Sequence, residues 1–352
     1  MQNLTNLSLF SGAGGLDIGL QQAGIQTTAY VESDKNCLNT LKNNIPQDTT
    51  PIRFFTDVKD FTGGDKWDII SGGPPCQSFS TAGKRKALED PRGNLIYDFI
   101  RIVDTGRPRF FIMENVRGLL SASLLNKPAG SVLNEEIIPK FVDMGYELST
   151  GLVNTLDYGI PQDRKRFFII GSRDHEFNTW PDQLPIKQLL PPTHGPTTNL
   201  PYMVLKDAIS DLYDSNEEPE YIPYATHRAN IYAQIPPGKN WRFFVNSPPY
   251  APDFVKSLMG GAYNSSGGRV GFWRRLTWDK WSPTLTTSPI QKATGFCHPD
   301  ENRPLSVQEY ARIQGFPDDW KFTGNTTAKY RQIGNAVPIK LGEVIGKALI
   351  NI

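Results

Sequence analysis

The chain has 352 residues, of which 38% are hydrophobic and 21% are charged, and its formal net charge at pH 7 is +1. This composition indicates a globular protein, and no apolar run approaches the length of a membrane span. The near-neutral charge neither favours nor excludes a nucleic-acid partner, because binding depends on where the cations lie. The start, MQNLTNLSLF, lacks the basic and apolar regions of a secretory signal, so we expect a cytoplasmic protein without membrane attachment.

The cysteines and histidines form no recognisable disulfide or metal pattern. Cys37, Cys76 and Cys297 are far apart, no CxxC pair is present, and the four histidines are scattered. This spacing predicts neither a disulfide framework nor a zinc site, so we expect no metal. The spacing is compatible with one reactive cysteine.

Short apolar strands alternate with amphipathic helices over the first 172 residues. The predicted strands are Leu7–Phe10, Thr28–Val31, Ile52–Phe55, Asp68–Ile70, Phe110–Glu114 and Arg166–Ile170. The predicted helices between them are Leu16–Ala23, Lys35–Asn43, Leu95–Asp104 and Asn134–Met144. The alternation predicts a parallel, doubly wound α/β sheet, in which ligands bind at the carboxyl ends of the strands.

The composition changes after the last of these strands. From about Trp180 to Gly271 the chain is rich in Pro, Gly, Asn, Ser and Tyr, which predicts an irregular, loop-dominated domain. Regular structure returns with an amphipathic helix over Arg303–Pro317 and a last helix over Ile339–Leu349, entered through Pro338. We therefore expect a first domain of residues 1–178, completed by residues 325–352, and a second domain with its hinge over residues 179–324.

A glycine-rich turn follows the first predicted strand. In FSGAGGLDIGL (Phe10–Leu20), the glycines allow a tight turn and a close approach of backbone to ligand. Glu32 ends the second strand, at the spacing of an acid that binds ribose hydroxyls, and Asp57 ends the third, where it would meet an adenine amino group. These features predict an adenosine-type cofactor. NAD and S-adenosylmethionine both fit, and the GAGG turn favours a cofactor without phosphates.

GGPPCQSFSTAGKR (residues 72–85) places a thiol in stiff backbone. Pro74 and Pro75 fix their φ angles, and Cys76 follows them just after the end of a predicted strand. One interpretation is a turn with an incidental thiol, and the other is a nucleophile whose direction is fixed by the turn.

Two further segments carry charged groups to the same edge of the sheet. FFIMENVRG (Phe110–Gly118) is an apolar strand that ends in Glu114, and partial burial there would raise the pKa of this acid. In IPQDRKRFFIIG (Ile160–Gly171), extended backbone places Gln162, Arg164 and Arg166 on one face. Two guanidinium groups on one face suit a phosphate or a base carbonyl.

These segments together resemble the motifs of the DNA (cytosine-5)-methyltransferases of the prokaryotic restriction–modification type. In chain order, the matching segments are FSGAGGLD, GGPPCQSFS, MENVRG, QDRKR, PLSVQEYARIQGFPDDW and QIGNAVP. The resemblance covers almost the whole chain, although residues 180 to 285 correspond only in position. Two places depart from the family pattern, namely WSPTLTT (Trp281–Thr287), where an arginine often precedes the proline, and Ser33 after the ribose acid.

The resemblance implies a Rossmann-like S-adenosylmethionine-dependent methyltransferase sheet with a smaller, loop-rich target-recognition domain inserted before the C-terminal helix. It implies methyl transfer to carbon 5 of a flipped-out cytosine in a short specific sequence of double-stranded DNA. Cys76 is then the nucleophile that adds to carbon 6, Glu114 holds a proton at ring nitrogen 3, and Arg164 and Arg166 hold the base carbonyl or a phosphate. The implied cofactor contacts are Phe10, Gly12, Leu16, Glu32, Asp57, Val58, Pro74, Leu95 and Asn335.

The same resemblance implies how the protein meets DNA. Ser80, Lys84 and Arg85 would lie near phosphates in a loop, Ser78–Arg92, that closes over the target base. Within the variable region, the residue types that read base edges are Asn264, Arg269, Arg274 and Arg275. The resemblance also implies a monomer associated with the nucleoid of a prokaryotic cell. It further implies genetic pairing with a restriction endonuclease, whose cleavage the methylation would block.

Three other functions account for part of the sequence. An NAD-dependent oxidoreductase explains Gly12 and Glu32 but not GGPPCQ or QDRKR, and selective binding of S-adenosylmethionine over NAD would exclude it. A catalytically inactive DNA-binding module would not need Cys76, Glu114 and both arginines. An RNA cytosine methyltransferase would share the catalytic set, and the loop-rich insertion favours duplex DNA over it.

Overall fold

The computed structural model describes residues 4–46, 52–62, 65–75, 95–124, 126–213, 218–246, 250, 252–264 and 271–352. The chain forms two compact units. The first unit contains Met1–Gly159, Arg164–Pro201 and Ala336–Ile352, and the second contains Ile160–Asp163 and Tyr202–Asn335. This division assigns no role to either unit, so the predicted catalytic and target-recognition domains stay a prediction.

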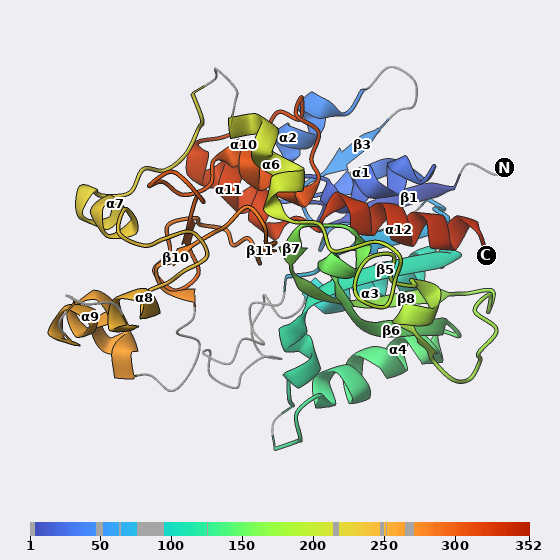
Figure 1. The fold of residues 1–352 in the computed structure, drawn as a ribbon. Coiled ribbons are helices and arrows are strands. Elements are labelled where there is room, and N and C mark those ends of the chain that lie inside the picture. The colour runs from blue at the N-terminus through green and yellow to red at the C-terminus, as the bar shows by residue number, and fades with distance from the viewer. Residues whose placement is uncertain are drawn as a thin grey trace. The chain divides into compact units, whose positions relative to one another are not determined.

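The first unit is built on a mixed sheet (Figure 1). In spatial order, its strands are β3 (Arg53–Phe55), β2 (Gln26–Val31), β1 (Thr5–Leu9), β4 (Ile69–Gly72), β5 (Phe110–Val116), β8 (Lys165–Ser172), β6 (Glu147–Asn154) and β9 (Leu184–Pro185). The strands from β3 to β5 are parallel, whereas β8 runs antiparallel to both β5 and β6. The α/β class is therefore confirmed, and the expectation of a wholly parallel sheet is wrong at β8.

The reversal at β8 follows from a short connection. Strand β6, which we did not predict, ends at Asn154, and β8 begins at Lys165. Residues 155–164 are too few for the crossover that joins parallel strands, so the chain turns back beside β6. Their turn includes the 3₁₀ helix η4 (Thr155–Tyr158).

Helices follow the strands as the glycine turns and caps predict. They are α1 (Gly15–Gln22), α2 (Lys35–Asn44), α3 (Leu95–Gly106), α4 (Ile138–Asp143), α5 (Ile186–Leu189) and α12 (Ile339–Ile350), with a 3₁₀ helix η2 (Arg117–Ser121) and a π-helical turn η3 (Val132–Ile137). Figure 1 shows α12, near the C-terminus, beside α1. Their axes approach closely because glycines face each other: a Cβ at Gly19 would lie 2.1 Å from the Ile339 carbonyl oxygen, and one at Gly342 would lie 2.5 Å from that of Leu16.

The second unit holds more regular structure than its composition suggests. Its helices are α6 (Leu205–Tyr213), α7 (Thr226–Tyr232), α8 (Arg242–Asn246), α9 (Pro252–Met259), η5 (Gly260–Asn264), α10 (Val307–Gln314) and α11 (Thr326–Asn335). Its short strands pair as β7 (Gln162–Asp163) with β11 (Ser282–Pro283), and β10 (Arg274–Arg275) with β12 (Phe296–Cys297). The expectation of a loop-dominated region is thus wrong for α6 to α9. Helices α7 to α9 pack on a core that includes Tyr232, Trp241 and Phe244, and α6 packs against α10.

Helix α10 shows how local sequence sets helix ends. Ser306 and Glu309 form a reciprocal capping box at its start, and Gly315 ends it with a φ of 86°. The predicted helix over Arg303–Pro317 is therefore shorter than expected at both ends.

Candidate active site

The turn after β1 is shaped for a close ligand. Gly12 (φ 56°) and Gly14 (φ 84°) adopt left-handed conformations, and among the described residues no atom lies within 4 Å of a Cβ built on Gly12. Phe10 also has a positive φ of 54°, which costs about 1–3 kcal/mol for a residue with a side chain. A strained residue beside open space at a strand end makes this turn a candidate ligand-binding position. Leu16, the second residue of α1, is buried.

Glu32 links this turn to the end of β2. Its Oε2 accepts a hydrogen bond from the Gly12 amide at 2.8 Å, and its Oε1 accepts one from the Asp34 amide at 2.7 Å. Burial raises the pKa of Glu32, and the two amide donors oppose this rise. Each carboxylate oxygen can accept a further donor, so the acid is placed to receive hydroxyl groups.

The third strand end is held by an arginine from α3. Arg101 donates through Nη2 to the Val58 carbonyl at 2.9 Å and through Nη1 to that of Phe61, also at 2.9 Å. This clamp leaves the Asp57 side chain exposed, with Oδ1 accepting from the Lys59 amide, while Val58 is buried. The turn is therefore rigid and its acid is accessible.

The described part of the thiol turn ends at Pro75. The Asn115 side chain donates through Nδ2 to the Pro74 carbonyl at 3.1 Å, and Asn115 is itself buried. A Cβ at Gly72 would lie 2.4 Å from the Leu9 carbonyl oxygen, and one at Gly73 would lie 2.8 Å from Glu114 Oε2. The two glycines thus let the turn pass close to β1 and to the acid. Cys76, Ser80, Lys84 and Arg85 lie outside the described residues, as does Arg269.

The predicted acid and one predicted arginine form an ion pair. Arg166 Nε lies 2.8 Å from Glu114 Oε1, and the two side chains are only 13% and 12% exposed. Burial raises the pKa of Glu114, while the nearby charges of Arg166 and Arg164 lower it. A carboxyl group with a raised pKa, at the strand end next to Pro74, can hold a proton for a bound molecule.

Arg164 lies in a different environment from Arg166. Its side chain is 1% exposed, and its Nη2 donates to the Ala336 carbonyl at 3.0 Å. Burial lowers the pKa of Arg164 well below its usual value, with a further contribution from the charge of Arg166. The alternation of side chains thus correctly brings the two arginines near one acid, but only Arg166 remains partly exposed.

The remaining candidates lie at the ends of helices or on short strands. Leu95 begins α3 and packs partly buried against the first unit's core, whereas Asn335 ends α11 in the second unit and is exposed. Asn264, a candidate base reader, ends η5 and is exposed.

Arg275 is wrong as a base reader because its guanidinium is committed inside the second unit. It is 4% exposed and donates to the backbone carbonyls of Tyr232, Ile235, His298, Pro299 and Glu301. Arg274, on the same short strand, is half-buried, so it stays a candidate base reader. Burial lowers the pKa of its guanidinium group.

Sequence reasoning assigned no role to Asn115 or to Arg101, although both shape the site. Asn115 could have been noticed because it follows Glu114 directly at the end of a predicted strand. Arg101 had no such signal, since its partners lie about 40 residues earlier in the chain.

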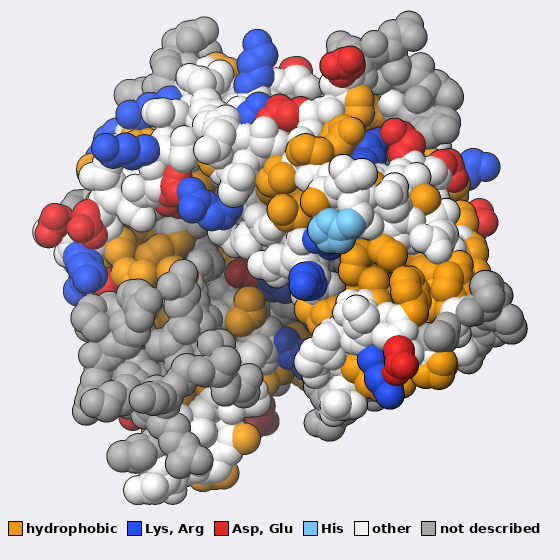
Figure 2. Space-filling model, turned by 90° about the vertical axis from the view of Figure 1, so that its left-hand side faces the viewer, with side chains coloured by type: hydrophobic (Ala, Val, Ile, Leu, Met, Phe, Trp, Pro, Cys, Tyr) orange, Lys and Arg blue, Asp and Glu red, His pale blue; other side chains and the backbone are white. Residues whose placement is uncertain are grey.

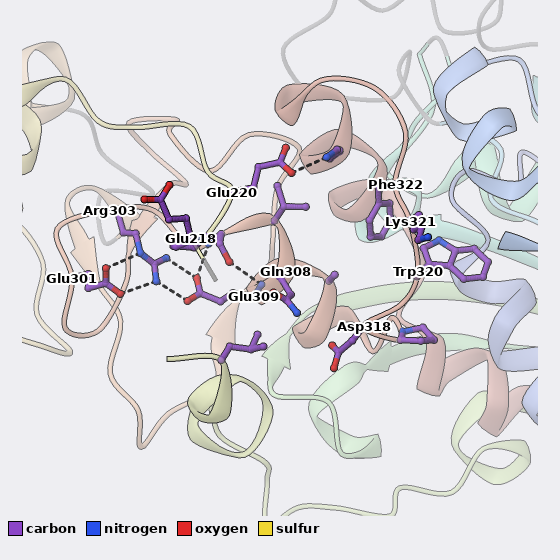
Figure 3. A pocket seen from close by; sticks show the side chains of 17 residues that line it. Glu218, Glu220, Glu301, Arg303, Gln308, Glu309, Asp318, Trp320, Lys321 and Phe322 are labelled. Carbon is purple, nitrogen blue, oxygen red and sulfur yellow. Dashed lines mark hydrogen bonds and ion pairs between the residues drawn. The ribbon is translucent and has the colours of Figure 1, made fainter. Parts of the chain in front are cut away.

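A polar cavity of about 790 Å³ lies within the second unit, around α10 (Figure 3). Figure 3 shows Arg303 between Glu301 and Glu309. Glu220, also labelled there, pairs with Lys329. Most of these charged side chains are thus engaged in ion pairs with one another. None of the predicted catalytic residues lines it.

The surface is mixed in character. Figure 2 shows Lys and Arg side chains lying singly on the face in view, among apolar and acidic ones. Within the described ranges, no group of three or more His, Cys, Asp and Glu side chains could hold a metal ion. No helix among those residues is long and apolar enough to cross a membrane.

Comparison with known proteins places these features in context. The family model described as C-5 cytosine-specific DNA methylase matches residues 4–351. Type II methyltransferase M.Sau96I of Staphylococcus aureus is 41% identical over 347 residues, which span 97% of this chain and 74% of that protein. Type II methyltransferase M.Eco47II of Escherichia coli is 39% identical over 353 residues, which span 99% of this chain and 79% of that protein.

Solved structures show the same fold. A DNA modification methyltransferase encoded within an E. coli prophage matches with a TM-score of 0.71 at 23% identity, over 99% of both chains. The S. pombe Dnmt2 methyltransferase matches with a TM-score of 0.63 at 17% identity, again over 99% of both chains.

Proposed function

The chain belongs to the C-5 cytosine-specific DNA methylase family, and on that premise we propose that it transfers a methyl group from S-adenosylmethionine to carbon 5 of cytosine in duplex DNA. The observation that carries this proposal is the Glu114–Arg166 pair, which lies at the end of β5 next to the Pro74 turn that leads to Cys76. An acid, a cation and a thiol are the groups that activation of a cytosine ring requires.

The first unit offers residues that fit the cofactor. The open space over Gly12 and the carboxylate of Glu32 suit a ribose, and the exposed acid of Asp57 suits an adenine amino group. The residues proposed to hold S-adenosylmethionine are Phe10, Gly12, Leu16, Glu32, Asp57, Val58, Pro74, Leu95 and Asn335. When bound, it supplies an electrophilic methyl group.

The chain's own residues would activate the base. The Cys76 thiolate adds to carbon 6, and the electron pair of the ring then makes carbon 5 nucleophilic. Glu114 holds a proton at ring nitrogen 3, offsetting the charge that addition places on the ring, and its raised pKa supports this role. Arg166 holds the base carbonyl. After methylation of carbon 5, a base removes its proton and the thiolate leaves.

The cytosine must leave the stacked duplex for these groups to reach it. We propose that Ser80, Lys84 and Arg85 contact phosphates beside the extruded base. Residues 1–178 with 325–352 would form the catalytic domain, and residues 179–324 the target-recognition domain. The monomeric enzyme would protect the DNA of a prokaryotic cell, in its cytoplasm and at the nucleoid, from a partner restriction endonuclease.

A trapping experiment tests this mechanism. Duplex DNA with 5-fluorocytosine at the target position blocks the final proton removal, so the protein should remain covalently bound in the presence of S-adenosylmethionine. We expect Cys76→Ser to abolish the adduct in a denaturing gel, whereas Cys37→Ser, at a buried cysteine of α2, should retain it. An adduct that survives Cys76→Ser would overturn the assignment of the nucleophile.

A further inference from the structure

Arg164 is a fully buried arginine at a junction of the chain. It is the first residue after the second unit's segment Ile160–Asp163, and Ala336 is the first residue after the second unit's helix α11. The hydrogen bond from Arg164 Nη2 to the Ala336 carbonyl therefore joins two points at which the chain returns to the first unit.

The backbone of Arg164 is fixed as well as its side chain. Its amide donates to Thr155 Oγ1 at 3.2 Å, and its carbonyl accepts from the Thr155 amide at 3.0 Å. Arg164 thus lies in the turn that leads from β6 to β8, directly before the strand that carries Arg166. A buried guanidinium held in this way has no path to a phosphate at the surface.

The segment that Arg164 holds forms the back of the cofactor turn. A Cβ at Gly15 would lie 2.3 Å from the Val337 carbonyl oxygen and 3.2 Å from the Ala336 Cβ. Any displacement of Ala336 or Val337 would therefore move the wall against which Gly15, at the end of this turn, packs. One side chain connects the strand of the Glu114–Arg166 pair with the turn at the end of β1.

We propose that Arg164 is a positioning residue, which seats Ala336 and Val337 behind the cofactor turn and contacts neither DNA nor cofactor. This inference rests on the proposed function, because it concerns the site of S-adenosylmethionine. It differs from the role implied by the family resemblance, in which Arg164 lies beside a base or a phosphate.

Equilibrium binding separates the two roles without catalysis. Affinity for S-adenosylmethionine is measured by calorimetry, and affinity for duplex DNA is measured at several salt concentrations. For Arg164→Met we expect at least about tenfold weaker binding of S-adenosylmethionine, the effect of losing one hydrogen bond to a charged group. Binding of DNA and its salt dependence should stay as in the wild type.

Two further variants complete the test. Arg164→Lys keeps a charge and one donor, so it should recover part of the lost cofactor affinity, and it carries the test if Arg164→Met does not fold. Arg173→Met, at the other end of β8, is the matched control and should bind both ligands normally. A salt dependence of DNA binding reduced by about one counterion in either Arg164 variant would overturn the proposal. Normal cofactor affinity in both would do so too, whereas failure of the wild type to bind S-adenosylmethionine would instead contradict the proposed function.

Discussion

Two carboxylate–arginine pairs in this protein are built differently. At the end of β5, the Glu114 carboxylate pairs with the Nε of Arg166. In the second unit, Glu309 accepts both Nη groups of Arg303, at 2.8 and 2.9 Å, and the amide of Ser306 at 2.6 Å. Glu309 is also the more buried acid, with 4% of its side chain exposed against 12% for Glu114.

The number of donors decides what each pair can do. Three donors leave Glu309 with its charge well compensated, and its geometry closes the capping box of α10. Among the described residues, fewer donors reach Glu114, and it lies in a desolvated position, so its pKa is raised. The first arrangement holds a fold together, and the second keeps a carboxyl group able to carry a proton.

The largest expected effect comes from removing that proton. Glu114→Gln keeps the shape and an acceptor for Arg166, but its amide cannot protonate ring nitrogen 3. Single-turnover methylation of duplex DNA should slow by about 10²- to 10⁴-fold, the usual contribution of a general acid. The thermal midpoint should fall as well, because Arg166 loses its carboxylate partner, so the rate is measured on folded protein. A rate within tenfold of the wild type would remove Glu114 from the mechanism.

The opposite result is expected at the second pair. Glu309→Gln leaves Arg303 as a buried cation with one carboxylate partner, Glu301, and should cost about 3–5 kcal/mol of unfolding free energy. Urea denaturation measures this loss. Folded Glu309→Gln protein should retain its rate of methylation. A slower rate of methylation with normal stability would show that Glu309 acts in catalysis and does not serve the fold.

The sequence predicts much of the fold. Its motifs predict that Glu114 and Arg166 come together, but it does not predict the Glu309–Arg303 pair. Apolar runs and glycine turns locate most strands and helices of the first unit because those signals are local. Strand β6 was missed because Glu147 and Ser149 interrupt its apolar pattern, and the reason for Glu147 lies far along the chain, where its carboxylate accepts the amides of Phe177 and Trp180. Contacts between residues about 30 positions apart produce no periodic pattern in the sequence.

The same limit applies to the site. Glu114 and Arg166 meet because β8 runs antiparallel to β5, which places the start of β8 beside the end of β5. The parallel sheet that the sequence predicts would have placed them at opposite edges. Alternation along a strand cannot tell which arginine is covered, and the partner of Arg164 is 172 residues away. Arg275 is the clearest case, because all five of its carbonyl partners lie in other segments.

A third carboxylate, held by neutral donors, gives the smallest expected effect. Asp17 in α1 is 3% exposed and accepts hydrogen bonds from Ser8 at 3.0 Å and Thr27 at 3.2 Å. Burial is the main cause that raises the pKa of Asp17 from 3.8 to about 6. The folded protein therefore keeps this proton between pH 4 and 6, where the unfolded chain releases it.

The contribution of Asp17 to stability is thus complete below pH 4 and is lost as the pH rises through about 6. Between pH 5 and pH 7, the wild type should lose about 1 kcal/mol of unfolding free energy more than Asp17→Asn, whose side chain does not titrate. Urea denaturation at the two pH values measures the difference, with Asp143→Asn, at an exposed position ending α4, as the control that should follow the wild type. Equal pH dependence in wild type and Asp17→Asn would mean that neutral donors suffice to keep this buried acid ionised. In that case, burial alone could not be the reason that the pKa of Glu114 is raised.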